Sequence, residues 1–304
     1  MTPQPSTSAQ NFLDPKTVAL ISNYPLVARL IVDGYFMGHH RGSRHAFSLE
    51  YSRHREYYPG DPLKLVDWKL FGKTDRFYVK QYEEETNLAA WLLVDISKSM
   101  GYQGSKASMT KLRYATYLAA ALSYLLLSQR DLVGMMLFDD RLRKVITPSA
   151  ATKQLHILLR ELYLVQEGGL SRFGQAGKHA ASRIKKRGLV ILFSDLLAQP
   201  EEIEKTLKSF LHQNNEMIVF HVLSPDEMAF PFKRFGQFED METHQRILLQ
   251  PDLFKDKYRK EMDRYLLEIR NLCRKMKVDY QLLHTDMPYD LAIAAFLNTR
   301  MRMN

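Results

Sequence analysis

Cysteine is almost absent from this sequence of 304 residues, because Cys273 is the only one. A single cysteine excludes an internal disulfide, and no Cys-x-x-Cys pair is present to indicate a zinc or redox site. Long apolar runs are also missing, since no stretch reaches the roughly 18 residues that a membrane helix needs. The first residues, 1–6, lack the basic and then apolar layout of a signal peptide. We therefore expect a cytosolic (cytoplasmic) protein in which Cys273 packs on a helix face.

The phosphate-binding pattern Gly-x-x-x-x-Gly-Lys-Ser/Thr does not occur either, so the chain is not expected to be an ATPase itself. What is present is an ordinary globular composition, with 45% hydrophobic and 25% charged residues. Such a composition argues against a chain that is disordered throughout. The net charge is +9, and basic residues are dense between positions 39 and 55.

This basic segment has two interpretations. It is either a solvated loop or a surface for an anionic partner, with Arg41, Arg44, Arg53 and Arg55 as candidate contacts. No aromatic platform and no recognised nucleic-acid motif accompany it, so a protein partner is favoured over DNA or RNA. Nucleic-acid binding through the basic N-terminal half stays as an alternative.

The N-terminal part of the chain reads as a leader followed by a small module. Residues 1–12 are rich in Pro, Ser, Thr and Gln, and they predict a disordered leader. Residues 13–87 are grouped as N-terminal helices and a small β-rich module. Helical spacing of apolar residues predicts two short helices between Asp14 and Phe36, the second opened by Pro25. Strand-like pieces follow at 47–51 and 77–82.

The remaining residues, 88–304, alternate short apolar runs with helical segments, as a parallel sheet covered on both faces requires. This succession predicts a doubly wound, mostly parallel α/β domain. The expected core strands are 88–94, 133–138, 189–193, 217–223 and 278–283, with a polar edge strand at 143–146. The expected helices are 112–129, 152–164, 174–186, 200–213, 255–275 and 288–302. Residues 224–253 have little periodicity and are interpreted as a surface insertion carrying several phenylalanines.

Polar residues follow the first apolar run, where ligands bind in open α/β sheets. Asp95 stands at the expected strand tip, and Ser97 and Ser99 follow on alternate residues. Three hard oxygen ligands can therefore converge in one short loop, which suits Mg²⁺, Mn²⁺ or Ca²⁺ and disfavours zinc. The pattern has a simpler explanation, because serines before a helix often serve only as N-caps.

Two further features favour the metal. The strand at 189–193 ends in Ser194-Asp195, and the loop 167–171 supplies a flexible turn with a hydroxyl. Here the chain resembles the von Willebrand factor A-like family, whose metal-ion-dependent adhesion site uses Asp-x-Ser-x-Ser, a later Thr and a later Asp. The resemblance implies a site that binds rather than catalyses, with one coordination position open for an acidic residue of a partner. It implies these metal ligands: Asp95, Ser97, Ser99, Ser171 in place of the Thr, and Asp195.

A second resemblance covers nearly the whole chain. Arg55-Glu-Tyr-Tyr-Pro-Gly-Asp-Pro62, Val66-Asp-Trp-Lys69 and Tyr78-Val-Lys-Gln-Tyr-Glu-Glu-Glu-Thr-Asn87 look like the signature of domain-of-unknown-function family 58 (DUF58). This resemblance implies a bacterial adaptor or chaperone-like partner of a MoxR-type AAA+ ATPase. The role of the signature residues is left open, since they also suit turns and an aromatic anchor; they are Gly60, Asp61, Asp67 and Trp68.

The sequence thus predicts a non-catalytic protein-interaction module that depends on Mg²⁺ or Mn²⁺, with Ca²⁺ as a further option. The alternative is a metal-assisted hydrolase that uses Asp95 and Asp195 with a histidine between His39 and His54 as acid or base. A hydrolase needs a general base within reach of a metal-bound water, and no residue is assigned to that role. The spacing of His39, His40 and His45 is also a poor match to a zinc site.

Overall fold

The architecture is that of a computed structural model. It describes residues 23–39, 54–58, 66, 68–80, 89–170, 172–233, 235–241 and 245–303. The chain divides into two compact units: residues 42–87 form the smaller one, and residues 1–41 together with 88–304 form the larger one.

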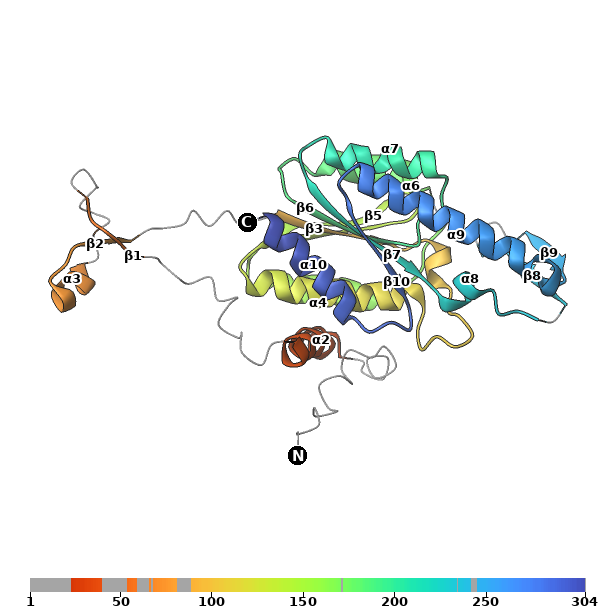
Figure 1. The fold of residues 1–304 in the computed structure, drawn as a ribbon, viewed down its shortest axis with the longest axis horizontal. Coiled ribbons are helices and arrows are strands. Elements are labelled where there is room, and N and C mark those ends of the chain that lie inside the picture. The colour runs from red at the N-terminus through yellow and green to blue at the C-terminus, as the bar shows by residue number, and fades with distance from the viewer. Residues whose placement is uncertain are drawn as a thin grey trace, which may run out of the picture. The chain divides into compact units, whose positions relative to one another are not determined.

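A six-stranded sheet forms the centre of the larger unit (Figure 1). Its strand order is β10-β7-β6-β3-β4-β5, and every neighbouring pair is parallel except β4 with β5. The strands are β3 (Ala89–Asp95), β4 (Leu132–Phe138), β5 (Leu142–Ser149), β6 (Leu189–Ser194), β7 (Glu216–Leu223) and β10 (Asp279–His284). All six predicted strands are confirmed, and the doubly wound, mostly parallel sheet is confirmed with them.

Helices cover both faces of this sheet (Figure 1). On one face, α4 packs on β3 and β4 and contacts α5; on the other, α6, α7 and α9 form a second layer. The bounds of the helices are α4 (Lys111–Ser128), α5 (Gln154–Leu164), α6 (Phe173–Arg183), α7 (Pro200–Leu211), α9 (Pro251–Lys275) and α10 (Asp290–Met303). Among the described residues, no helix combines the length and the apolar character that crossing a bilayer requires.

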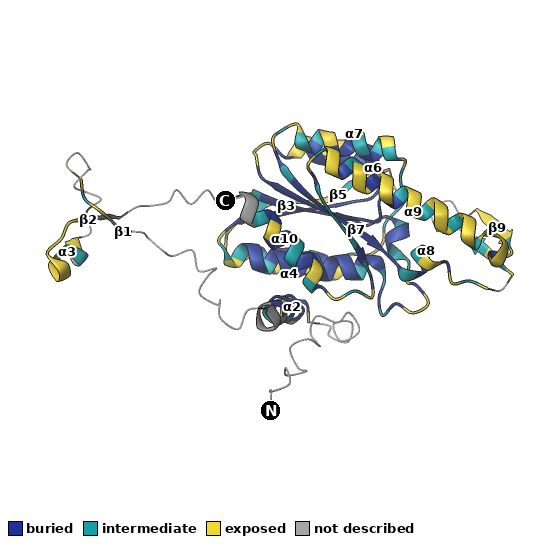
Figure 2. Cartoon of the chain, viewed as in Figure 1, coloured by how far each residue is buried: buried dark blue, intermediate teal, exposed yellow. Residues whose placement is uncertain are grey.

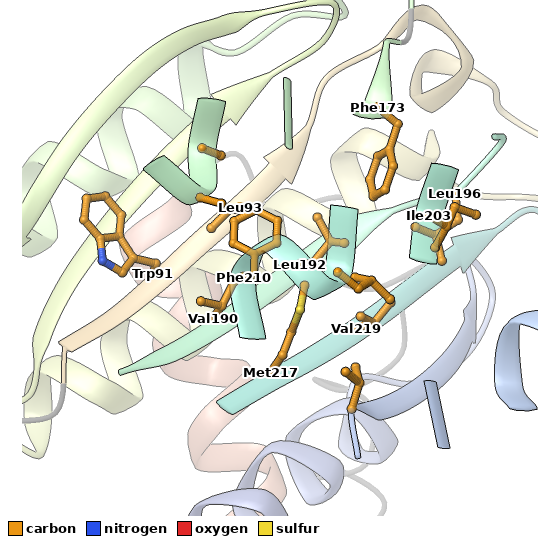
Figure 3. Packing of buried hydrophobic residues seen from close by; sticks show 14 of the residues in the cluster. Trp91, Leu93, Phe173, Val190, Leu192, Leu196, Ile203, Phe210, Met217 and Val219 are labelled. Carbon is orange, nitrogen blue, oxygen red and sulfur yellow. The ribbon is translucent and has the colours of Figure 1, made fainter. Parts of the chain in front are cut away.

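The core lies between the sheet and the helices, because the four central strands β7, β6, β3 and β4 are buried on both faces (Figure 2). On the face covered by α6 and α7, side chains of neighbouring strands meet aromatic rings from the helices (Figure 3). Phe210 of α7 is only 1% exposed there, and Cys273 of α9 is fully buried in the same cluster, as expected. Large buried apolar side chains of this kind each contribute about 2 kcal/mol to folding through their removal from water.

Helix α2 (Tyr24–His39) packs against α4 of the larger unit. Its first residue is fixed there, since the Tyr24 hydroxyl lies 2.9 Å from the Thr116 hydroxyl. Pro25 follows at the start of the helix, as predicted. The grouping of residues 13–87 as one module therefore differs from the observed units, because the buried face of α2 is covered by α4. The first of the two expected helices lies outside the described residues.

The smaller unit contains β1 (His54–Glu56), which pairs antiparallel with β2 (Tyr78–Lys80). The expected strand at 77–82 is present at Tyr78–Lys80, while residues 81–82 and the expected strand at 47–51 lie outside the described residues. Helix α3 (Trp68–Thr74) was not predicted. Trp68 is 57% exposed and meets Phe71 and Phe77 edge to face, with ring centroids 6.3 and 6.4 Å away.

The insertion has more regular structure than its sequence suggests. It contains α8 (Pro225–Ala229) and a hairpin of β8 (Gly236–Glu239) and β9 (Arg246–Leu249). Aromatic packing explains the difference, since Phe230 stacks with Phe238 and also contacts Tyr258 of α9. Helix α9 begins at Pro251, four residues before its expected start at 255.

Candidate metal-binding site

The Asp95 loop is built at the carboxyl end of β3. Asp95 is the last residue of the strand, and the chain then turns through a short 3-10 helix at Lys98–Gly101. The Asp95 carboxylate accepts a hydrogen bond from the Ser97 amide (2.9 Å), and the hydroxyls of Ser97 and Ser99 lie 3.1 Å apart. All three side chains are buried. The expected convergence of oxygen atoms in this loop is therefore present.

Asp195 joins them from β6, the neighbouring parallel strand. Val94 of β3 pairs with Phe193 of β6, so the residues after these positions leave the sheet side by side. Asp195 is 2% exposed, and the Ser99 hydroxyl is near enough to help lower the pKa of its carboxyl. Two buried carboxylates and two hydroxyls thus meet at one edge of the sheet.

Ser194 fixes the relative position of the two carboxylate loops. Its hydroxyl donates to Asp95 Oδ2 (2.7 Å) and accepts from the Leu196 amide (3.0 Å). Leu196 has a φ of 48°, in the left-handed region that bulky side chains rarely adopt. Such backbone strain persists where the surrounding structure requires it, and it often accompanies functional sites.

The two carboxylates have opposite protonation behaviour. Burial, followed by repulsion from Asp195, raises the pKa of Asp95 to about 7. Burial alone would also raise the pKa of Asp195, but the Lys111 ammonium and the Ser99 hydroxyl bring it below its usual value. Near neutral pH, Asp195 is therefore ionised, whereas Asp95 beside it can bind a proton or another cation.

Lys111, at the start of α4, provides the cation that faces Asp195. Its side chain is fully buried, with Nζ 2.8 Å from Asp195 Oδ2 and 2.6 Å from Glu227 Oε1 of α8. Burial opposes the charged form, yet the two carboxylates raise the pKa of Lys111 above its usual value. This ammonium therefore stays charged and joins the site to the insertion.

His221 of β7 contacts the backbone of the Asp195 loop. Its Nε2 lies 2.8 Å from the Asp195 backbone oxygen, and its Nδ1 lies 2.8 Å from the Tyr280 hydroxyl. The imidazole is fully buried, and burial lowers the pKa of His221 to about 4. Because both ring nitrogens are engaged, His221 positions the backbone and does not serve as a general base.

The loop before Ser171 lies against the Asp95 loop. The Gly168 amide donates to the Ile96 backbone oxygen (2.6 Å), and the Lys98 amide donates to the Gly169 oxygen (3.0 Å). Asp139, at the tip of β4, accepts from the Gly169 amide (2.9 Å) and from Arg143. Burial would raise the pKa of Asp139, but these hydrogen bonds bring it below its usual range. Ser171 itself lies outside the described residues.

The structure brings four of the five candidate ligands together, namely Asp95, Ser97, Ser99 and Asp195. Arg55 and Trp68 lie in the smaller unit. The other candidate residues lie outside the described part of the chain: Arg41, Arg44, Arg53, Gly60, Asp61 and Asp67.

The sequence reasoning missed Ser194, Asp139, Lys111 and Glu227 as parts of the site. One local signal was available for Lys111. A lysine in the first turn of a helix opposes the helix dipole, so its presence there needs another explanation.

The donor set fits a hard divalent cation. Carboxylate and hydroxyl oxygens suit Mg²⁺ and Mn²⁺, whereas zinc prefers nitrogen and sulfur ligands. The described residues contain no group of three or more His, Cys, Asp or Glu placed to hold a metal. A metal at this site would therefore depend on the serine hydroxyls as well as on Asp95 and Asp195.

Comparison with known proteins gives a family and several relatives. The family described as "Protein of unknown function DUF58" matches residues 53–270, which is more than half of the chain. The uncharacterized protein Mb1516 of Mycobacterium bovis is 23% identical over 303 residues, covering 98% of this chain and 94% of that protein.

The solved structures that are similar to this chain include the following two. Protein BatB from Bacteroides thetaiotaomicron is 16% identical and has a TM-score of 0.48, with 70% of this chain and 99% of that chain covered. The SpRpn10 VWA domain is 14% identical and has a TM-score of 0.35, with 45% of this chain and 76% of that chain covered.

Proposed function

The chain belongs to the DUF58 family, and on this premise we propose that it is a protein-interaction module that works through a bound divalent cation. The cation is Mg²⁺ or Mn²⁺, with Ca²⁺ as a further option, and its proposed ligands are Asp95, Ser97, Ser99, Ser171 and Asp195. One coordination position is left for a carboxylate of the protein partner. The module binds and does not catalyse.

One observation carries the proposal: the buried charge at this edge of the sheet is unbalanced. Asp95, Asp195 and Glu227 bring three carboxylates together, and Lys111 brings one ammonium. Fully ionised, these groups have an excess of two negative charges, which is costly in a buried place. A divalent cation removes this excess, whereas a monovalent cation leaves half of it.

The raised pKa of Asp95 supports the same interpretation. Without a metal, a proton is the cation that relieves the repulsion between Asp95 and Asp195, and it binds Asp95 with a pKa of about 7. Metal ligands must be deprotonated, so a metal at this site would displace that proton. Binding is therefore expected to release protons and to strengthen as the pH rises through 7.

The proposed partner is a MoxR-type AAA+ ATPase or one of its clients. This assignment is supported by the family resemblance, by the missing phosphate-binding motif in this chain and by the donor set that suits a partner carboxylate. A pull-down with the purified ATPase as prey, with Mg²⁺ and then with chelator, tests it. Retention that does not depend on the metal would contradict the proposed mode of binding.

A calorimetric titration with Mg²⁺ and with Mn²⁺ tests the metal site itself. Wild type is expected to bind one equivalent, and Asp95→Ala is expected to bind none. Asp252→Ala is the matched control, because it removes an exposed carboxylate from the first turn of α9. Equal binding by wild type and Asp95→Ala would rule the site out.

The part of the chain that the structure describes offers no observation in favour of the hydrolase or of nucleic-acid binding. His54 lies on β1 of the smaller unit, and His221 has both ring nitrogens engaged. The family is one of unknown function and the relatives are uncharacterized, so the comparisons indicate no catalytic activity. The non-catalytic module therefore remains the proposal.

A further inference from the structure

We propose that Lys111 couples metal binding to the segment 225–233, because its ammonium is shared between Asp195 and Glu227. The inference rests on the proposed metal site and adds a means of regulating it. When a cation binds at Asp95 and Asp195, Lys111 gives up part of its contact with Asp195 and pairs more closely with Glu227. The metal site and the insertion then influence each other.

The geometry makes Lys111 the shared element. Its Nζ lies almost equally close to both carboxylates, 2.8 Å from Asp195 and 2.6 Å from Glu227, and its side chain has no exposure to water. Water therefore cannot replace either carboxylate as a partner. Any loss of attraction toward Asp195 has to be taken up by Glu227.

Glu227 transmits the change because three hydrogen bonds fix it to α4, to the start of the insertion and to α9. Its Oε1 accepts from Lys111, its Oε2 accepts from the Ser224 amide (2.7 Å), and its backbone oxygen accepts from the Tyr258 hydroxyl (2.7 Å). The neighbouring Asp226 carboxylate accepts from the Ser105 amide at 2.6 Å. Helix α8 is thus held to α4, to α9 and to the loop that follows the metal motif.

Glu227 also lines a cavity of about 630 Å³. Glu227, Tyr102, Phe230 and Tyr258 form part of its wall. A volume of this size is within the usual range for binding pockets, roughly 300–1,000 Å³. Coupling between two sites is reciprocal. A ligand that binds in this cavity and moves Glu227 therefore changes the metal affinity by the same factor by which the metal changes the affinity for that ligand.

Removing the charge of Lys111 and removing the charge of Glu227 are expected to change metal affinity in opposite directions. Lys111→Met removes a positive charge and frees a carboxylate oxygen of Asp195, so Mn²⁺ affinity is expected to rise about tenfold. Glu227→Gln leaves Lys111 to pair with Asp195 alone, so the affinity is expected to fall about tenfold. If Lys111 only held Asp195 in place, Lys111→Met would lower the affinity instead.

The test is calorimetric titration of the full chain with Mn²⁺ for wild type and both variants. Lys208→Met and Glu204→Gln are matched controls, since these residues form an exposed pair at 2.6 Å on α7. The double variant Lys111→Met/Glu227→Gln removes both charges together, so it keeps the buried charge balance if Lys111→Met alone fails to fold. Its affinity is expected to lie above that of Glu227→Gln.

Hydrogen exchange of residues 225–233 supplies an independent readout. Mn²⁺ is expected to change the exchange of these amides in wild type and to leave it unchanged in Glu227→Gln at metal saturation. Shifts of both single variants in the same direction, or no shift in either, would overturn the coupling while the metal site stands. If wild type does not bind Mn²⁺, the proposed function fails and the coupling fails with it.

Discussion

The substitution Asp95→Asn is expected to stabilise the metal-free protein and to remove its response to metal. Asparagine keeps the size of the side chain and an oxygen that accepts from the Ser97 amide. It removes the negative charge that burial and Asp195 oppose. A candidate ligand is therefore predicted to cost stability when no metal is bound.

The magnitude follows from the pKa of Asp95. Its value in the folded protein is about 7 and its ordinary value is 3.8, so the folded state holds the proton more tightly than the unfolded state. The cost is absent below pH 4, grows as the pH rises and is complete above pH 7. The difference between these two pKa values corresponds to about 4 kcal/mol, so a gain of roughly 2–4 kcal/mol is expected for Asp95→Asn at pH 8.

Urea denaturation with chelator at pH 8 and at pH 4 measures this difference. The advantage of Asp95→Asn should be present at pH 8 and small at pH 4. Addition of Mg²⁺ at about one hundred times its dissociation constant should stabilise wild type by about 2.7 kcal/mol and leave the variant unchanged. If Asp95→Asn is less stable than wild type at pH 8 without metal, the electrostatic reasoning is wrong.

Three further outcomes are expected. The pKa of buried His221 is about 4, below its ordinary 6.5, so its contribution to stability is complete above pH 6.5 and is lost as the pH falls toward 4. Between pH 6.5 and 4, the unfolding free energy of His221→Asn should fall by about 3 kcal/mol less than that of wild type, as measured by denaturation. Equal pH slopes of the unfolding free energy for the two proteins would contradict this. Ser171→Ala should weaken Mn²⁺ binding about tenfold in calorimetry if Ser171 is a ligand. Phe210→Ala should lower the unfolding free energy by about 3–5 kcal/mol without changing metal affinity.

The sequence by itself determined the strands, most helices and the loop that carries Asp95, Ser97 and Ser99. Buried parallel strands read as continuous apolar runs, and their ends place polar residues at one edge of the sheet. Asp95, Ser97 and Ser99 are neighbours in the chain, so their convergence needs only a local turn. Asp195 was found because it follows another apolar run, and the parallel order brings it to the same edge.

Only the tertiary structure decided which distant residues complete the site. Lys111 reaches Asp195 across 84 positions and Glu227 across 116 positions of the chain. These contacts depend on the strand order, which places β6 beside β3, and on the packing of α4 and α8. Helix α2 is a second example, because the sequence shows its apolar face but does not show that this face packs against α4.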